Sequence, residues 1–142
     1  MAEMIYEIPG FENGCVQRFG CDTEDRSLTV AAKLVSELLN KWNTNVAFFS
    51  LTGHGERMAD LVKNESSFAR LYTVDQKNRD IRVIIRKAKG LVNRKFVRAV
   101  IIEGMPFKEE MPWRWLEQVA VSKNISITFV GVVDESSFNS NE

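Results

Sequence analysis

The sequence predicts a three-layer α/β domain built around a mostly parallel β-sheet. The strongest strand signals are short, nearly continuous apolar runs, which are typical of strands covered on both faces. Segments with apolar residues at three- to four-residue spacing alternate with these runs. Such alternation favours right-handed crossovers that place helices on both faces of a sheet. The length of 142 residues fits a single domain with a sizeable core.

The first half of the chain predicts a strand, a long helix, a second strand and a short helix. Residues 15–19 form the first, weak strand, whose long polar side chains Gln17 and Arg18 imply either an edge strand or a different register. Apolar residues repeat at helical spacing over residues 28–39. The run VAFFSL at 46–51 predicts a buried strand, and Met58, Leu61 and Val62 predict a short helix.

The second half continues the alternation. Residues 71–74 form a weaker strand, and an apolar stripe from Ile81 to Leu91 predicts a helix. The strand AVIIE at 99–103 precedes a helix that begins near Pro112, where a missing N–H costs nothing. The run ISITFVGVV at 125–133 is the last strand. We expect residues 1–134 to form one domain and residues 135–142 to form a flexible tail.

Composition excludes several classes of protein. The chain has 19 Lys and Arg against 19 Asp and Glu, which rules out a wholly basic coat protein and an acidic disordered tail. Two cysteines and one histidine cannot form a Cys/His zinc site, so we expect no metal site and two free thiols. No signal peptide or run of 18 apolar residues is evident, which predicts a cytoplasmic chain without a membrane contact.

The turn at residues 20–27 (GCDTEDRS) is similar to the phosphate-loop template G-x-x-x-x-G-K-[ST]. Gly20 and Ser27 match, whereas Asp25 replaces the second glycine and Arg26 replaces the lysine. Three carboxylates would face a bound anion there: Asp22, Glu24 and Asp25. That charge has the wrong sign for a polyphosphate, and one arginine cannot cancel it. An acidic helix N-terminus, which the helix dipole favours, is the preferred interpretation.

The order of these elements over residues 8–134 resembles the RecA-like ATPase core, closest to the C-terminal domain of bacterial replicative hexameric (DnaB-type) helicases. By this resemblance, Glu103 at the end of AVIIE matches the acidic residue that holds magnesium. Thr52 follows Phe-Ser-Leu where the family has its catalytic glutamate, and Val132 is nearest to the glutamine that senses the terminal phosphate. The sequence stops before the segment that would carry an arginine finger.

The resemblance therefore implies a scaffold without its catalytic positions. We expect a non-catalytic domain without a cofactor, acting as a binding or regulatory module in DNA replication or recombination of a mobile element. The alternative is a working P-loop-type ATPase with a variant phosphate loop. In that case Gly20, Arg26 and Ser27 would bind the phosphates of ATP, and Glu103 would hold magnesium.

Positive charge is concentrated in residues 77–98, which contain nine Lys or Arg and one acid, Asp80. The segment carries +8, so the other 120 residues carry −8. On a helix, one side would hold Arg79, Arg82, Arg86 and Lys89. This face predicts an anionic partner, either DNA or an acidic protein surface, with a solvated helix face as the alternative. Because Phe96 is the only aromatic nearby, DNA contacts would be mainly to phosphates.

A methionine- and tryptophan-rich stretch at residues 104–115 predicts a protein interface, which could join copies of this chain, with Met105, Phe107 and Trp115 as its contacts. Alternatively, Trp113 or Leu116 packs on the sheet and only Trp115 is exposed. By resemblance, this loop lies where RecA-like proteins carry a DNA-facing loop.

His54 lies between two glycines, close to Glu56. It could act as a general base with that glutamate, but it has no nucleophile at a recognisable spacing. A turn residue is the preferred interpretation.

Overall fold

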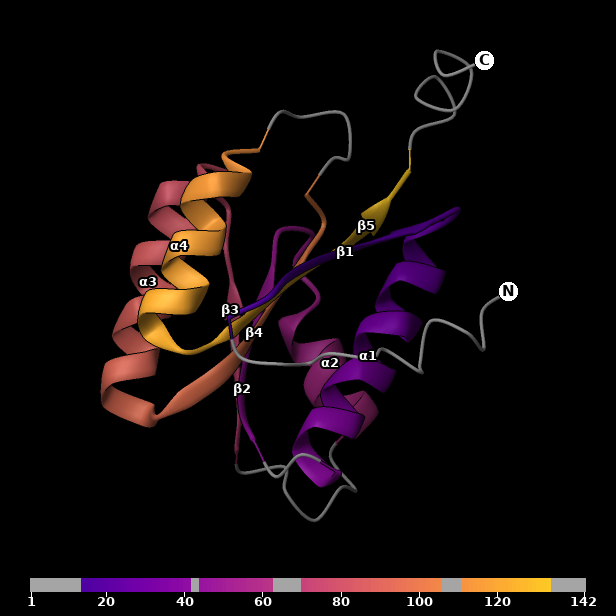
Figure 1. The fold of residues 1–142 in the computed structure, drawn as a ribbon. Coiled ribbons are helices and arrows are strands. Elements are labelled where there is room, and N and C mark those ends of the chain that lie inside the picture. The colour runs from indigo at the N-terminus through magenta and orange to yellow at the C-terminus, as the bar shows by residue number, and fades with distance from the viewer. Residues whose placement is uncertain (1–13, 42–43, 63–69, 106–110, 134–142) are drawn as a thin grey trace.

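The computed structural model describes residues 14–41, 44–62, 70–105 and 111–133. Within them, five parallel strands form one sheet in the order β1-β5-β4-β2-β3. The strands are β1 (Val16–Cys21), β2 (Asn45–Ser50), β3 (Leu71–Asp75), β4 (Val97–Glu103) and β5 (Ser126–Val132). The helices are α1 (Glu24–Asn40), α2 (Gly55–Val62), α3 (Ile81–Lys95) and α4 (Trp113–Lys123). Helices α1 and α2 cover one face of the sheet and α3 and α4 cover the other (Figure 1), which confirms the three-layer prediction.

Strand β1 is an edge strand, paired only with β5 among the described strands. This resolves the difficulty raised by Gln17 and Arg18, because an edge position tolerates long polar side chains that a central strand would bury. The central strands β4 and β2 are, by contrast, almost entirely buried. Their continuous apolar runs follow from helices covering them on both faces.

Two apolar cores lie on the two faces of the sheet. The cluster under α3 and α4 includes Phe49, Ile85 and Leu116, and the cluster under α1 includes Leu34, Phe48 and Ile101. Phe48 and Phe49 are neighbours in β2 and enter different clusters, because successive side chains of a strand point to opposite faces. Neither phenylalanine is exposed to solvent. The core therefore fixes which residues at the strand ends face the helices.

Local capping sets the ends of the helices that matter for the site. The Thr23 hydroxyl accepts a hydrogen bond from the Arg26 amide and caps α1. Asp80 caps α3 in the same way through the Arg82 amide. The helix α4 begins after Pro112 and ends at Lys123, and its C-cap residue Asn124 takes a left-handed conformation with φ 57°. Within the described part of the chain, no helix has the length and apolarity needed to span a bilayer. The predicted tail, residues 135–142, lies outside the described residues.

Candidate functional site

The turn between β1 and α1 is the place where a phosphate loop was considered. Strand β1 ends at Cys21 and helix α1 begins at Glu24, so only Asp22 and Thr23 separate them. A phosphate loop cradles its ligand with successive backbone N–H groups of a wider loop. Here Gly20 is still part of the strand, and the second half of the template lies inside the helix. The turn is too short to surround a polyphosphate.

The side chains predicted to bind nucleotide do not converge. Arg26 is exposed, and its guanidinium lies 3.1 Å from the Asp22 carboxylate. Ser27 is buried on the inner side of α1, and its hydroxyl has no hydrogen-bond partner among the described residues. Glu24 and Asp25 occupy the first turn of α1. Their carboxylates interact favourably with the helix dipole there and would repel a phosphate. ATP with magnesium does not fit this turn.

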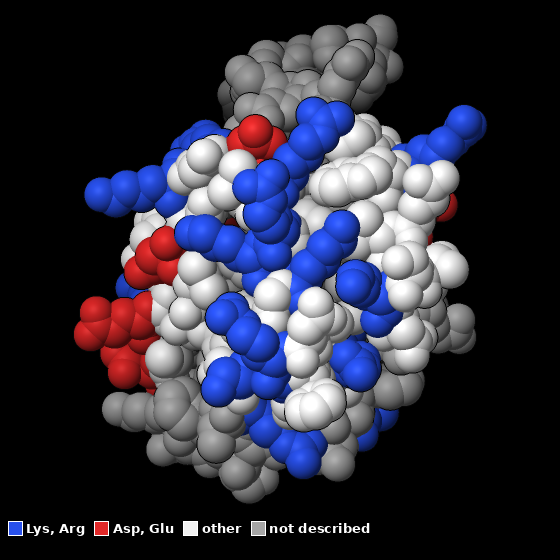
Figure 2. All heavy atoms as spheres, turned by 90° about the vertical axis from the view of Figure 1, so that its left-hand side faces the viewer, with Lys and Arg blue, Asp and Glu red and all other residues white. Residues whose placement is uncertain are grey.

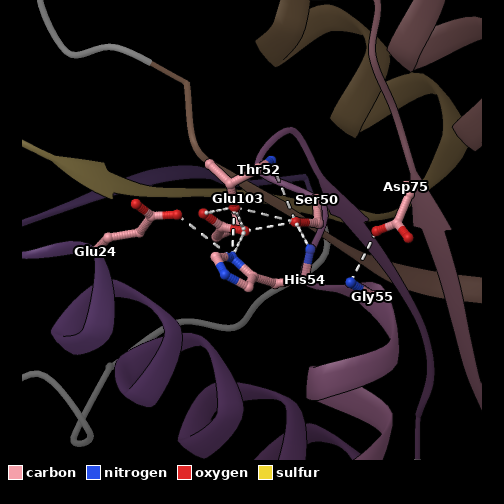
Figure 3. Close-up of polar contacts among 7 residues, drawn as sticks. All are labelled: Glu24, Ser50, Thr52, His54, Gly55, Asp75 and Glu103. Carbon is pink, nitrogen blue, oxygen red and sulfur yellow. Dashed lines mark hydrogen bonds and ion pairs between the residues drawn. The ribbon is translucent and has the colours of Figure 1, made fainter.

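A polar cluster lies at the carboxyl ends of the central strands (Figure 3). Ser50 at the end of β2 is in register with Glu103 at the end of β4, so the two side chains meet. Glu103 is 1% exposed, and its Oε1 accepts a hydrogen bond of 2.7 Å from the Ser50 hydroxyl. The Thr52 hydroxyl lies 2.7 Å and 2.8 Å from the two carboxylate oxygens. The predicted magnesium-holding residue is therefore already bound by two hydroxyl groups.

His54 completes this cluster. Its backbone N–H donates to the Ser50 hydroxyl at 2.8 Å, and its ring Nδ1 lies 2.6 Å from the Thr52 hydroxyl. Thr52 has one hydroxyl proton, and that proton points to Glu103. In the contact between His54 and Thr52, the Nδ1–H therefore donates and the threonine oxygen accepts. A threonine held in this way donates its proton to a carboxylate and is not activated as a nucleophile.

The acidic neighbours of His54 also argue against a catalytic relay. The same Nδ1 atom lies 3.6 Å from Glu24 and 3.7 Å from Glu103. In a triad the two ring nitrogens face different partners, one the nucleophile and the other the carboxylate. The carboxylates nearest to the ring come from α1 and β4, rather than from the neighbouring Glu56 as the sequence suggested. His54 therefore connects its own turn to strand β4 and helix α1, which fits the interpretation as a turn residue.

The third strand end is used for capping. The Asp75 carboxylate, at the end of β3, accepts the Gly55 N–H at 2.8 Å and holds the start of α2. A Cβ atom at position 55 would lie 2.8 Å from that carboxylate oxygen, so a larger residue there would have to displace the Asp75 side chain. Among the described residues, no group of three His, Cys, Asp or Glu side chains is placed to hold a metal ion.

Lys and Arg side chains gather on the α3–α4 side of the domain (Figure 2), where five cations of the basic segment line two hollows on α3: Arg82, Arg86, Lys87, Lys89 and Arg94. We call these five residues the basic face; the other four cations of the segment are Lys77, Arg79, Lys95 and Arg98. Seven of the nine are exposed, and the other two are half-buried. Arg79 precedes the cap of α3, so it does not continue the helical row of Arg82, Arg86 and Lys89 as predicted.

None of these nine cations forms an ion pair with a carboxylate of the described residues. Asp80, the only acid of the segment, is engaged as the cap of α3. Lys87 instead donates to the Gln76 side chain at 2.9 Å, and Arg94 to the Gly90 carbonyl at 3.2 Å. The cations of the basic face can therefore meet an anion without first breaking an ion pair among the described residues.

The predicted interface stretch separates into different environments. Met105 is 4% exposed and belongs to the core under α3 and α4, so it is a core residue and not part of the surface that we predicted. Phe107 lies outside the described residues. Trp113 packs edge-to-face on Phe129 with ring centroids 5.7 Å apart, which agrees with the first part of the alternative interpretation but not with its exposed Trp115. Trp115 is half-buried beside Lys89, whose ammonium lies 5.9 Å from the ring centroid.

Comparison with known proteins supports the fold. No family model matches the chain, and no curated protein matches it in sequence. Among solved structures it is similar to a KaiC-like protein from the hyperthermophilic archaeon Pyrococcus horikoshii OT3, with a TM-score of 0.66 and 11% identity. The similarity covers 89% of this chain and 66% of that one, so the chain spans slightly less than two thirds of that protein's length. The domain has the RecA-like α/β fold.

Proposed function

We propose that this chain is a non-catalytic RecA-like module that binds the phosphate backbone of nucleic acid through its basic face. Two features support the absence of hydrolysis. The β1–α1 turn has two residues, too few to surround a polyphosphate. Thr52, which stands where a base would polarise water, donates its proton to Glu103 instead. A role in DNA replication or in recombination of a mobile element is part of the proposal and rests on the resemblance to helicase domains alone.

One observation carries the binding proposal: five cations gather on α3 without a carboxylate partner among the described residues. Like charges repel one another, so such a face becomes more stable when an anion approaches it. A nucleic-acid backbone supplies regularly spaced negative charges and releases its condensed counterions on binding. Contacts to phosphates position a protein without selecting a sequence, so we expect binding to random sequences.

The test is fluorescence anisotropy with labelled random DNA, both single-stranded and double-stranded. Binding is measured first at low salt (about 50 mM) and then at increasing salt concentrations. Four phosphate contacts predict a slope of log K against log salt of about −3.6 on duplex, and a shallower slope on single strands. Arg82→Glu with Arg86→Glu should remove most of the binding. Both side chains are exposed on the solvent side of α3, so the double variant should keep its melting temperature.

A matched control reverses two exposed cations on the other side of the sheet. Lys41→Glu with Arg57→Glu changes the net charge equally but leaves the basic face intact, so DNA binding should stay near that of the wild type. Equal losses in the two double variants would show that only net charge matters. Failure of the wild type to bind either form of DNA at low salt would refute the proposal. Binding of an acidic protein in its place would reassign the face.

A further inference from the structure

A hollow of about 350 Å³ opens between α3 and α4 on the basic face. Three cationic side chains surround it, from Arg82, Arg86 and Lys89. Its apolar lining comes from Ile85 of α3 and Trp115 of α4. This volume lies at the lower end of the range for small-ligand sites, about 300–1,000 Å³. The combination of apolar lining and cationic rim suits a flat ring attached to negative charge.

Trp115 gives this hollow an aromatic wall. Its side chain packs against the core under α3 and α4, which holds the indole in place. The Lys89 ammonium lies over the ring, 5.9 Å from its centroid. Because a lysine side chain is long and flexible, the ammonium can move from the ring to a phosphate and leave the ring free for a base. The tertiary structure thus supplies the aromatic that the basic segment lacks in sequence.

A second hollow, of about 380 Å³, lies on the other flank of α3. Its lining residues are Val74, Arg86, Lys87, Gly90, Leu91 and Arg94. Arg86 therefore contributes to both hollows and lies between them. A nucleic-acid strand that crosses helix α3 would contact Arg86 between the two hollows. Each hollow would offer it apolar lining residues.

We propose that the α3–α4 hollow receives an unstacked base of single-stranded nucleic acid. Trp115 serves as the stacking platform, and Arg82, Arg86 and Lys89 contact the flanking phosphates. This inference rests on the proposed function and makes it more specific. Duplex DNA keeps its base faces inside the helix, so it can use the cations but not the indole. The carboxylates of an acidic peptide would match the positive charge around the hollow, but they would not stack on the indole ring.

The experiment compares Trp115→Leu, which keeps apolar bulk without a flat ring, with Trp115→Phe, which keeps a ring. Probes are labelled oligothymidine and a labelled duplex of equal length, measured by anisotropy at low salt. Loss of one stacking platform should weaken single-strand binding by about 5- to 150-fold. Duplex affinity should stay unchanged, and the phenylalanine variant should restore most of the single-strand affinity. Phe96→Leu removes a ring that is 70% exposed and outside the hollow, and serves as the control.

The outcomes separate this inference from the proposed function. If Trp115→Leu leaves oligothymidine binding intact while reversal of Arg82 and Arg86 still abolishes it, the base site is wrong and the phosphate-binding face stands. Equal losses on oligothymidine and duplex would also overturn the base site, because they indicate a change in the fold. Wild-type protein that binds neither probe overturns both proposals. A polyglutamate probe that binds in their place identifies an acidic protein as the partner.

Discussion

Replacing Ser50 with alanine tests whether the polar cluster at the strand ends stabilises the fold. The Ser50 side chain has no exposure to solvent, and its hydroxyl has two short hydrogen bonds and two longer contacts, to the Thr52 hydroxyl at 3.3 Å and the Thr52 N–H at 3.4 Å. It donates to Glu103 Oε1 at 2.7 Å and accepts the His54 N–H at 2.8 Å. Alanine fits the same space with little change in volume, so the main effect of Ser50→Ala is the loss of the two short hydrogen bonds, with the longer Thr52 contacts as a smaller contribution.

The expected cost follows from the two bonds. A hydrogen bond to a charged group contributes about 1.5–3 kcal/mol, and an amide left without an acceptor costs about 1–3 kcal/mol. The two effects share one oxygen and partly relax together, so we expect a loss of roughly 2–4 kcal/mol in the free energy of unfolding. With a urea slope of about 2 kcal/mol/M, the midpoint of unfolding should fall by about 1–2 M.

Ser27→Ala is the matched control. Ser27 is also a buried serine, 1% exposed, but its hydroxyl has no partner among the described residues. Removing an unsatisfied hydroxyl from a helix should be neutral or stabilise the fold by about 1 kcal/mol. Both variants are compared with the wild type by urea unfolding followed by far-UV circular dichroism. Equal destabilisation by the two alanines, or no loss with Ser50→Ala, would refute our account of the cluster.

Two further predictions concern chemistry at the strand ends. The protein should show no ATP hydrolysis above background. ATP with magnesium, at a concentration that would saturate a typical site, should not raise its melting temperature. ATP turnover that Glu103→Gln abolishes would contradict this prediction. Burial raises the pKa of the Cys21 thiol, with Asp22 adding to the rise and Arg26 opposing it. The thiolate is the reactive form, so at pH 8 iodoacetamide should label Cys21 more slowly than the half-buried Cys15, as mass spectrometry would show; equal labelling rates would contradict the burial of Cys21.

Strand and helix positions could be predicted from the sequence because they depend on local periodicity. The run at 46–51 became β2, and the apolar stripe from Ile81 became α3. Even the doubtful first strand was informative. Gln17 and Arg18 left two possibilities, an edge strand or a different register, and β1 lies at the edge of the sheet. These features need only the pattern of apolar and polar residues, which the chain carries along its whole length.

The contents of the site were harder to predict. Glu103 was identified by resemblance, but Ser50 and Thr52 were not expected to bind it, because 53 and 51 positions separate them from it in the chain. The signal that could have found Ser50 is its place at the end of a buried strand, since the carboxyl ends of parallel strands meet at one edge. Met105 was misjudged because composition alone cannot separate a buried methionine from one at an interface.

The sequence by itself determined the layer architecture and the concentration of charge in residues 77–98. Periodicity and net charge are properties of neighbouring residues, so they need no knowledge of the fold. Only the tertiary structure showed that the β1–α1 turn has no room for a polyphosphate, and that Trp115 of α4 lies against Lys89 of α3. Both depend on how segments distant in sequence pack on the sheet, because the core decides where each strand ends and which helices become neighbours.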